Sequence, residues 1–205
     1  MFTVCQELKS NTNYEKYFDS ITNVDTHMTK NVEWGAVSYL AHSKYGLNGQ
    51  GIIRNSYNGY KTGIAANDEA NKYDTQNGIK ASTTNNIYGV YDMGGGAGEY
   101  IAGCYTGKTS LITSNTDTTF ISKYIDVYSD YSVSKYGDAV YEISNSTSGY
   151  NSWFNQHSNY ISSSIVVLVR GGAYYGGNAS GLFSFGRDLG GAVSGYSFRP
   201  VCIVN

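Results

Sequence analysis

The segment that most constrains how this chain can fold is its last part, residues 171–205. It reads GGAYYGGNASGLFSFGRDLGGAVSGYSFRPVCIVN and contains no Lys, Glu or Gln. Gly keeps a backbone adaptable, and Tyr supplies a large contact area at a small entropy cost, as in binding loops. Stiffer runs enclose the segment, the apolar run 165–169 before it and the run 197–201 at its end. The pattern predicts a binding surface between two strands, or else a Gly-rich hairpin loop region in an ordinary core.

Length and charge narrow the classes of protein. A chain of 205 residues is typical of one domain, 1–205, with a proper core. Its net charge of -2, without a polybasic run, argues against nucleic-acid partners. No apolar run approaches the roughly twenty residues of a membrane helix, so we expect no direct membrane insertion by this chain, and no secretory signal is visible. Only 15% of residues are charged and 21 are Tyr, which favours an exported, surface-displayed protein.

The cysteines and histidines indicate no metal site. Cys5, Cys104 and Cys202 are odd in number and far apart, which argues against a disulfide framework. There is no CxxC motif and no His-x-x-x-His pair, so we expect no zinc and no other bound metal.

The pattern predicts an α+β domain with few helices, short antiparallel strands and long loops. A helix should begin after Thr29 as N-cap and end before Gly46, with Trp34 on its apolar face as a core anchor. Residues 1–28 show weak helical turns only. Strands are predicted at 87–93, 99–103, 165–169, 182–185 and 197–201. Loop-rich regions are predicted at 46–86 and 105–163.

The run 94–98, Gly-Gly-Gly-Ala-Gly, lies between two predicted strands. A phosphate-binding loop would need a Gly-Lys-Ser/Thr ending and a helix after it, so we expect a tight turn here. Two nearby carboxylates, Asp92 and Glu99, could act as an acid/base pair or bind Ca²⁺, whereas Glu99 could equally accept backbone N–H bonds in a structural role. We expect Arg170 and Arg199 to be buried and to hold the two ends of the terminal segment.

Three blocks of the sequence also carry a family resemblance. They are VEWGAVSYLAHSKYG at 32–46, GVYDMGGGAGEY at 89–100, and RGG at 170–172 followed by SFRPV at 197–201. In this order they resemble the C-type lectin fold of the formylglycine-generating-enzyme type. They resemble most closely the variable proteins of diversity-generating retroelements, from about residue 22 to the C-terminus.

The resemblance implies a ligand-binding protein and not an enzyme. In that family an error-prone reverse transcriptase changes adenines in a copy of the 3′ coding region, which produces a hypervariable surface on a fixed scaffold. By position, the variable region spans about 173–196, and its thirteen diversified residues, here called the variable positions, are Ala173, Tyr175, Gly176, Ser184, Gly186, Arg187, Asp188, Leu189, Gly191, Val193, Ser194, Gly195 and Tyr196. Interleaved residues implied as scaffold are Tyr174, Gly177, Gly181, Phe183, Phe185, Gly190, Ala192 and Ser197, with Trp34, Glu99, Arg170, Phe198 and Arg199 as further scaffold.

The resemblance leaves the partner and its location as expectations. The implied ligand is an unknown protein or glycan, and the implied location is extracellular, on a cell surface, pilus or virion. A structural pilus or surface subunit with a variable exposed face is the alternative. An enzyme like the formylglycine-generating enzymes is disfavoured, because those use a cysteine pair near the Phe-Arg segment and only Cys202 lies there. Their calcium-binding turn keeps only Glu99 here, so calcium is a doubtful cofactor and no other is implied.

Overall fold

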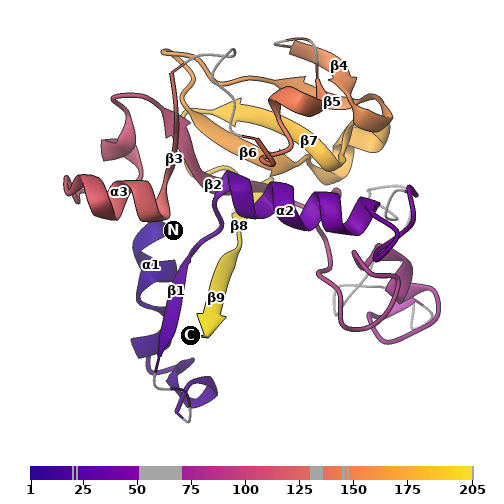
Figure 1. Ribbon diagram of the computed structural model, residues 1–205, viewed down its shortest axis with the longest axis horizontal. Helices are drawn as coiled ribbons and strands as arrows, with labels where there is room; N and C mark the ends of the chain where they lie inside the picture. Colours follow the sequence, from indigo (N-terminus) through magenta and orange to yellow (C-terminus); the bar gives the residue numbers. More distant parts are fainter. Residues whose placement is uncertain are drawn as a thin grey trace.

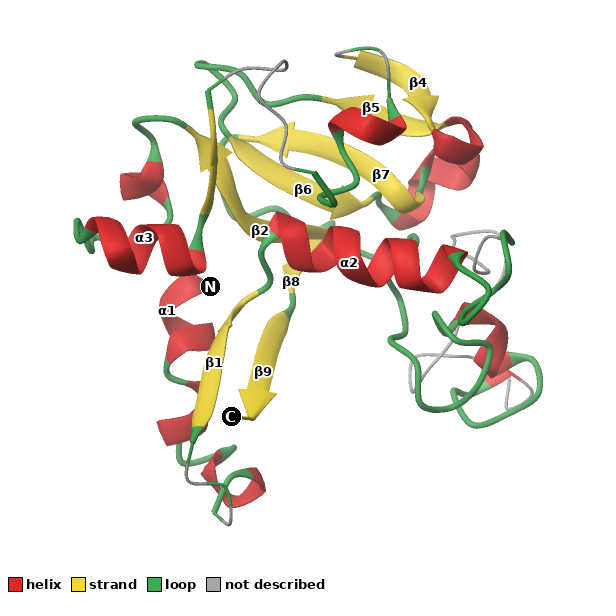
Figure 2. Ribbon diagram, in the orientation of Figure 1, coloured by secondary structure: helices red, strands yellow, loops and turns green. Residues whose placement is uncertain are grey.

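The computed structural model describes residues 1–19, 21, 23–50, 71–129, 136–144, 146 and 148–204. Within these ranges the chain forms an α+β fold, in which a large β-sheet and a separate two-stranded ribbon are accompanied by few helices (Figure 1, Figure 2). The α-helices are α1 (Phe2–Gln6), α2 (Asn31–His42) and α3 (Thr118–Tyr124). Short 3₁₀ turns connect them and the strands: η1 (Leu8–Ser10), η2 (Glu15–Tyr17), η4 (Gly78–Ala81), η5 (Thr109–Leu111), η6 (Tyr141–Ile143), η7 (Trp153–Asn155) and η8 (Tyr174–Ala179).

The large sheet has the strand order β3-β2-β6-β7-β5-β4, and β8 pairs with β2 outside this path. Its strands are β2 (Gly98–Tyr105), β3 (Asp126–Tyr128), β4 (Ser148–Ser152), β5 (Gln156–Asn159), β6 (Val167–Gly171), β7 (Gly181–Asp188) and β8 (Tyr196–Phe198). The strands β2, β6 and β7 are antiparallel neighbours, as are β4 and β5. Three pairs are parallel, namely β2 with β3, β2 with β8, and β5 with β7. The expected antiparallel pairing is therefore confirmed in part, and the sheet is mixed, because long connections such as 106–125 and 160–180 allow the chain to cross over between parallel strands.

The ribbon consists of β1 (Val24–Met28) and β9 (Pro200–Val204), which pair antiparallel. It extends away from the large sheet beside α1 (Figure 1). The strand predicted over 197–201 is thus two strands in different sheets, β8 and β9, with Arg199 between them. The change of sheet at Arg199 brings the end of the variable region onto β2, and the chain after it onto β1.

Helix α2 begins later than the sequence predicted. Thr29 is not its N-cap: the Thr29 hydroxyl donates instead to the carbonyl of Arg199 at 2.8 Å. Lys30 occupies the N-cap position, and the Glu33 carboxylate accepts its backbone N–H at 2.8 Å. The first turn of the helix is therefore stabilised by its own Glu side chain, which reaches back to the cap.

A second carboxylate, from a distant strand, completes the start of α2. Asp126 of β3 accepts the backbone N–H of Val32 at 2.9 Å, so it satisfies a helix donor that has no partner within the helix. At the other end the helix stops at His42, and its C-cap is Ser43. The predicted end at Gly46 was too late, because the chain already turns at 43–49 with the Leu47 N–H bound to the Ala41 carbonyl at 2.6 Å.

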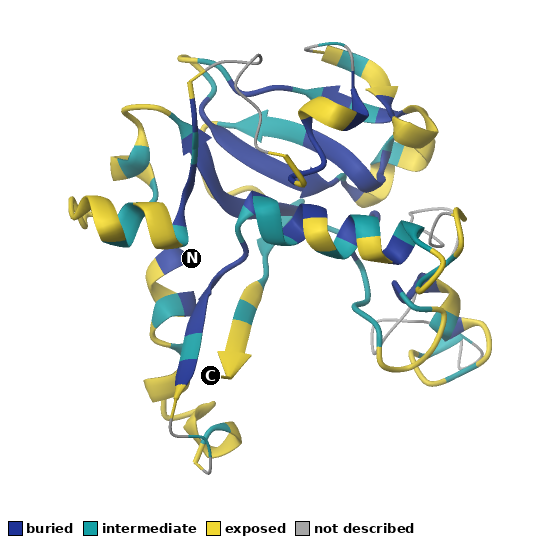
Figure 3. Cartoon of the chain, in the orientation of Figure 1, coloured by how far each residue is buried: buried dark blue, intermediate teal, exposed yellow. Residues whose placement is uncertain are grey.

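Trp34 anchors the core, as the sequence predicted. Its side chain is fully buried, and its indole N–H donates to the Leu182 carbonyl at 2.8 Å, joining α2 to β7. Around it lies a buried apolar cluster that includes Met93, Ile101, Tyr128, Leu168, Phe183 and Phe185. A second cluster on the other side of β2 and β6 includes Phe2, Met28, Tyr100, Cys104, Ile125 and Val167. Figure 3 shows the resulting buried centre of the sheet and the exposed outer parts of the helices.

The strand predicted at 87–93 was wrong. Tyr88 is 89% exposed, Asp92 has a positive φ of 59°, and the segment is irregular. Its backbone pairs locally, with Thr83 N–H donating to the Val90 carbonyl and the Val90 N–H donating to the Thr83 hydroxyl. Aromatic and β-branched residues favour strands only where a partner strand offers a half-buried surface, and none lies beside this segment among the described residues.

The remaining strand predictions were largely confirmed. The segment 99–103 lies within β2, 182–185 lies within β7, and 165–169 overlaps β6. The region 105–163, predicted as loop-rich, also holds α3, β3, β4 and β5, and the region 1–28 also holds β1. Part of the predicted loop 46–86, residues 51–70, lies outside the described residues. None of the described helices has the length and apolar content that crossing a membrane requires.

Candidate functional site

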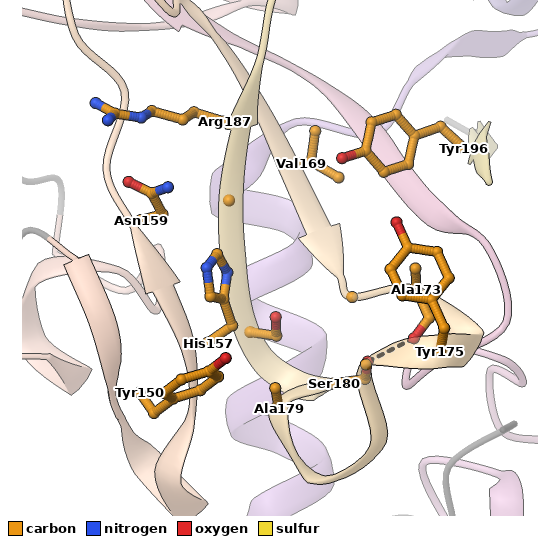
Figure 4. Close-up of a pocket in the computed structure, with 14 residues that line it drawn as sticks. Tyr150, His157, Asn159, Val169, Ala173, Tyr175, Ala179, Ser180, Arg187 and Tyr196 are labelled. Atoms are coloured by element: carbon orange, nitrogen blue, oxygen red, sulfur yellow. Dashed lines mark hydrogen bonds between the residues drawn. The ribbon is translucent and has the colours of Figure 1, made fainter. Parts of the chain in front are cut away.

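A cavity of about 410 Å³ lies over β7, between the β4–β5 hairpin and the loop that contains η8. Tyr150 and His157 stand along one side of it, and Tyr175 and Tyr196 stand along the other, with the β7 ribbon between them (Figure 4). Its volume falls within the range of about 300–1,000 Å³ that is usual for small-ligand sites.

Seven of the thirteen variable positions line this cavity. They come from three separate parts of the chain, namely the η8 segment, β7 and β8. They are Ala173, Tyr175, Gly176, Ser184, Gly186, Arg187 and Tyr196. Ala173 and Ser184 are buried, so they contribute to the floor of the cavity rather than to an exposed rim.

The other six variable positions lie at the end of β7 and in the loop from β7 to β8. These are Asp188, Leu189, Gly191, Val193, Ser194 and Gly195. Leu189 is 67% exposed and Val193 is 47% exposed. Both side chains are therefore available to a partner without any change in the core.

This β7–β8 loop is held at its base by Tyr100 of β2. The Tyr100 hydroxyl donates to the Asp188 carboxylate and, at 2.9 Å, to the Gly191 carbonyl. Burial and the neighbouring Asp188 carboxylate raise the pKa of Tyr100 above its usual range, so the hydroxyl keeps its proton and remains a donor. Tyr100, on strand β2, therefore orients the β7–β8 loop, whose exposed side chains do not take part in the core.

Backbone geometry separates the glycines of the variable region into two groups. The three implied as scaffold have positive φ angles: Gly177 at 53°, Gly181 at 155° and Gly190 at 86°. The four at variable positions, Gly176, Gly186, Gly191 and Gly195, do not have positive φ. Only the second group has a backbone that any residue can adopt without strain.

The space around the variable glycines differs in one case. A Cβ added at Gly186 would lie 3.8 Å from His157, and one at Gly195 would lie 3.7 Å from Tyr175, which are ordinary contacts. At Gly191 there is no atom within 4 Å. At Gly176, however, a Cβ would lie 2.5 Å from the Ser180 hydroxyl oxygen, so a larger residue there requires Ser180 to turn.

The aromatic residues implied as scaffold also differ among themselves. Phe183 and Phe185 of β7 are buried in the core, whereas Phe198 is half-buried. Tyr174 is 43% exposed, and Ala192 is exposed as well. Burial therefore supports a frame role for the β7 phenylalanines but not for Tyr174 or Ala192.

Arg170 holds the start of the terminal segment, as predicted. Its fully buried guanidinium donates to the carbonyls of Ala139 at 3.0 Å and Leu182 at 3.3 Å, and it lies over the ring of Trp34. Burial lowers the pKa of Arg170 to about 10, so it is charged at neutral pH. The same burial raises the pKa of the nearby Asp138 to about 6.

Arg199 holds the other end of the segment, but its side chain is 29% exposed, so it is half-buried and not buried as expected. Its guanidinium forms a two-point ion pair with Glu99, at 3.0 Å and 2.5 Å, and donates to the Tyr91 carbonyl at 3.1 Å. Burial raises the pKa of Glu99 even though Arg199 opposes the shift. Both Glu99 oxygens bind Arg199, which favours the structural role for Glu99 over the acid/base role.

The described residues offer no cluster of three or more His, Cys, Asp or Glu side chains able to hold a metal ion. The three cysteines are all free thiols. Cys5 and Cys104 are buried, and burial raises the pKa of Cys5 to about 11, whereas Cys202 is exposed on β9.

Several residues of the cavity were missed by the sequence analysis. Tyr150, His157 and Asn159 come from the β4–β5 hairpin, and Ser180 and Ala179 come from the end of η8. The hairpin lies in a polar stretch that gave no strand pattern, and only its aromatic residues could have suggested a role. Comparisons with known protein families, with curated proteins and with solved structures found no match.

Proposed function

We propose that this chain is the ligand-binding variable protein of a diversity-generating retroelement, with a C-type lectin-like fold of the formylglycine-generating-enzyme type. Its thirteen variable positions form one binding surface for a protein or glycan partner, displayed outside the cell on a surface, pilus or virion. The role is recognition rather than catalysis.

One observation carries the proposal: the glycines implied as fixed and those implied as variable, which are interleaved along the chain, differ in their backbone conformation. The fixed glycines of the region have positive φ, and the variable ones do not. A random exchange at the variable glycines therefore meets no backbone strain, whereas an exchange at Gly177 or Gly190 does. The two β7 phenylalanines between variable positions are buried, which limits change there as well.

Anchoring of the segment supports the same function. Arg170 and Arg199 bind backbone carbonyls and the Glu99 carboxylate, and Tyr100 donates to the Gly191 carbonyl at the base of the β7–β8 loop. None of these acceptors is a variable side chain, so exchange of the variable side chains leaves these bonds in place, whereas the second bond of Tyr100, to the Asp188 carboxylate, depends on Asp188. A rigid frame of this kind allows many sequences to be displayed with little effect on folding.

Sequencing the genomic locus in many isolates tests the proposal. We expect a nearby imperfect repeat that differs from the coding region at template adenines, a reverse-transcriptase gene, and amino-acid changes confined to the thirteen variable codons. The codons of Gly177, Gly181, Gly190, Phe183 and Phe185 serve as the internal control and should not vary. Changes that scatter over the core, or a locus without repeat and reverse transcriptase, would refute it.

A further inference from the structure

The cavity has two walls of different origin. One wall consists of Tyr150, His157 and Asn159 from the β4–β5 hairpin, which lies outside the variable region. The facing wall consists of Tyr175 and Tyr196, which are variable positions (Figure 4). On the proposed function, one wall changes between variants and the other does not.

The constant wall is ordered by its own contacts. The rings of Tyr150 and His157 meet edge to face with centroids 6.0 Å apart. Burial lowers the pKa of His157, although a bond to the Phe185 backbone opposes the shift, so its ring is neutral at pH 7 and has one nitrogen engaged with Phe185. Tyr150 is 64% exposed, so most of its side chain is open to solvent and is not part of the core.

The lining combines apolar faces with polar edges. Tyrosine rings stand on both sides, and the floor is made of small residues such as Ser184 and Gly186. Among the described residues that line the cavity there is no carboxylate, and Arg187 is the only fixed charge. One donor of the Arg187 guanidinium is engaged, because its Nη1 donates to the Tyr160 carbonyl at 3.1 Å, whereas its Nε is buried without a partner.

We propose that this cavity is a saccharide subsite, in which Tyr150 and His157 of the constant wall bind one sugar ring and the variable wall selects what is attached to it. A sugar ring has an apolar C–H face that packs on an aromatic ring and hydroxyl groups at its edge that bond to Tyr, His and Asn. The inference rests on the proposed function and specifies its ligand class.

Size and polarity favour this occupant over a peptide. A cavity of about 410 Å³ holds a ring with its substituents but not a helix or an added strand. A buried aliphatic side chain would leave the tyrosine hydroxyls and the Asn159 amide without partners, which is costly. Sugar hydroxyls supply partners of both kinds, donor and acceptor.

The test uses the whole chain on an array of diverse saccharides, followed by titration of each saccharide that binds. We expect binding of a group of saccharides that share one ring. Tyr150→Ala should weaken all of them by about tenfold, because it removes a stacking face from the constant wall. The matched control is Tyr88→Ala, since Tyr88 is exposed and does not line the cavity, and it should leave binding unchanged. Tyr196→Ala should change which of the saccharides are preferred.

A second readout locates the sugar. The chain has three histidines, so the ring signals of His157 can be assigned with a His157→Gln variant and followed by NMR. Addition of the saccharides that bind should shift the His157 signals and not those of His27. Absence of binding to every saccharide, or binding that Tyr150→Ala leaves intact, would overturn the inference.

These outcomes separate the two proposals. Binding of a protein target that depends on Leu189 and Tyr196 but not on Tyr150, without any saccharide, would refute the subsite and leave the proposed function standing. Saccharide binding in a chain whose locus shows no repeat and no variation would support the subsite and refute the proposed function.

Discussion

Two adjacent glycines give a direct test of the division between fixed and variable positions. Gly190 has a φ of 86° and is implied as fixed, whereas Gly191 has no positive φ, is implied as variable, and would carry a Cβ in open space. We expect Gly190→Ala to be less stable than Gly191→Ala, although the two changes add the same methyl group and lie one residue apart.

The magnitude follows from a subtraction. Replacing Gly by Ala reduces the conformational entropy of the unfolded chain and adds about 0.4–1 kcal/mol of stability where the native backbone permits it. This term is the same for both variants, so it cancels in their comparison. What remains is the left-handed strain of an alanine at Gly190, about 1–2 kcal/mol. The Cβ at Gly190 adds only an ordinary contact of 3.4 Å with Val167.

The measurement is equilibrium unfolding in urea, with the thermal midpoint as a second probe. For a chain of this size, a difference of 1–2 kcal/mol corresponds to about 2–8 °C in Tm. The urea m-value should be equal in both variants, because the exposed surface does not change. Equal stabilities, or a Gly191→Ala variant that is the less stable of the two, would contradict the backbone reasoning.

Three further predictions test the frame and the electrostatics. Gly176→Ala should cost about 1 kcal/mol, because it turns Ser180 and breaks the bond of 2.7 Å from its hydroxyl to the Ala173 carbonyl, whereas Gly186→Ala should be close to neutral in the same unfolding assay. Arg199→Met should cost about 3–5 kcal/mol, because it leaves the buried Glu99 carboxylate unpaired, and adding Glu99→Gln should recover part of the loss; a double variant no more stable than the single one would refute this explanation. Burial alone would lower the pKa of His27, but its bonds to Glu33 at 2.8 Å and Asp25 at 3.0 Å raise the pKa above 6.5, so the folded protein holds the proton more tightly than the unfolded chain. This stabilisation is therefore complete below pH 6.5 and is lost as the pH rises through the folded pKa. The urea unfolding midpoint should fall with rising pH over that interval, and His27→Gln should remove this dependence on pH. A variant whose midpoint depends on pH as that of the unaltered protein does would refute the role of His27.

Much of the frame was predictable from the sequence because it depends on local pattern. The apolar face of α2 identified Trp34 as a core residue, and the strands within β2, β6 and β7 follow from short apolar and aromatic runs. Buried arginines beside turns were expected to bind carbonyls or a carboxylate, and Arg170 and Arg199 do so. Residue types with one strong preference, such as a large apolar ring or a guanidinium with five donors, reveal their environment even without coordinates.

The failures share a physical cause, which is that the deciding partner is distant in the sequence. The segment 87–93 has the composition of a strand, but no strand lies beside it among the described residues. The backbone of Val90 therefore forms hydrogen bonds with Thr83 instead. Helix α2 takes part of its N-terminal capping from Asp126, almost a hundred residues away, and this freed Thr29 to bind Arg199. Neither the missing partner strand nor the capping of α2 by Asp126 can be predicted from the residues next to it in the sequence.

The sequence by itself determined the composition of the terminal segment: Gly, Ser and Tyr in a chain with few charges, enclosed by runs that must be strands. Only the tertiary structure decided which of these residues share a surface. Parallel pairing of β8 with β2, and of β5 with β7, brings Tyr196 and the β4–β5 hairpin to the two sides of one cavity. Backbone angles likewise decided which glycines can change, because the sign of φ depends on the path the chain must follow and not on the identity of the residue.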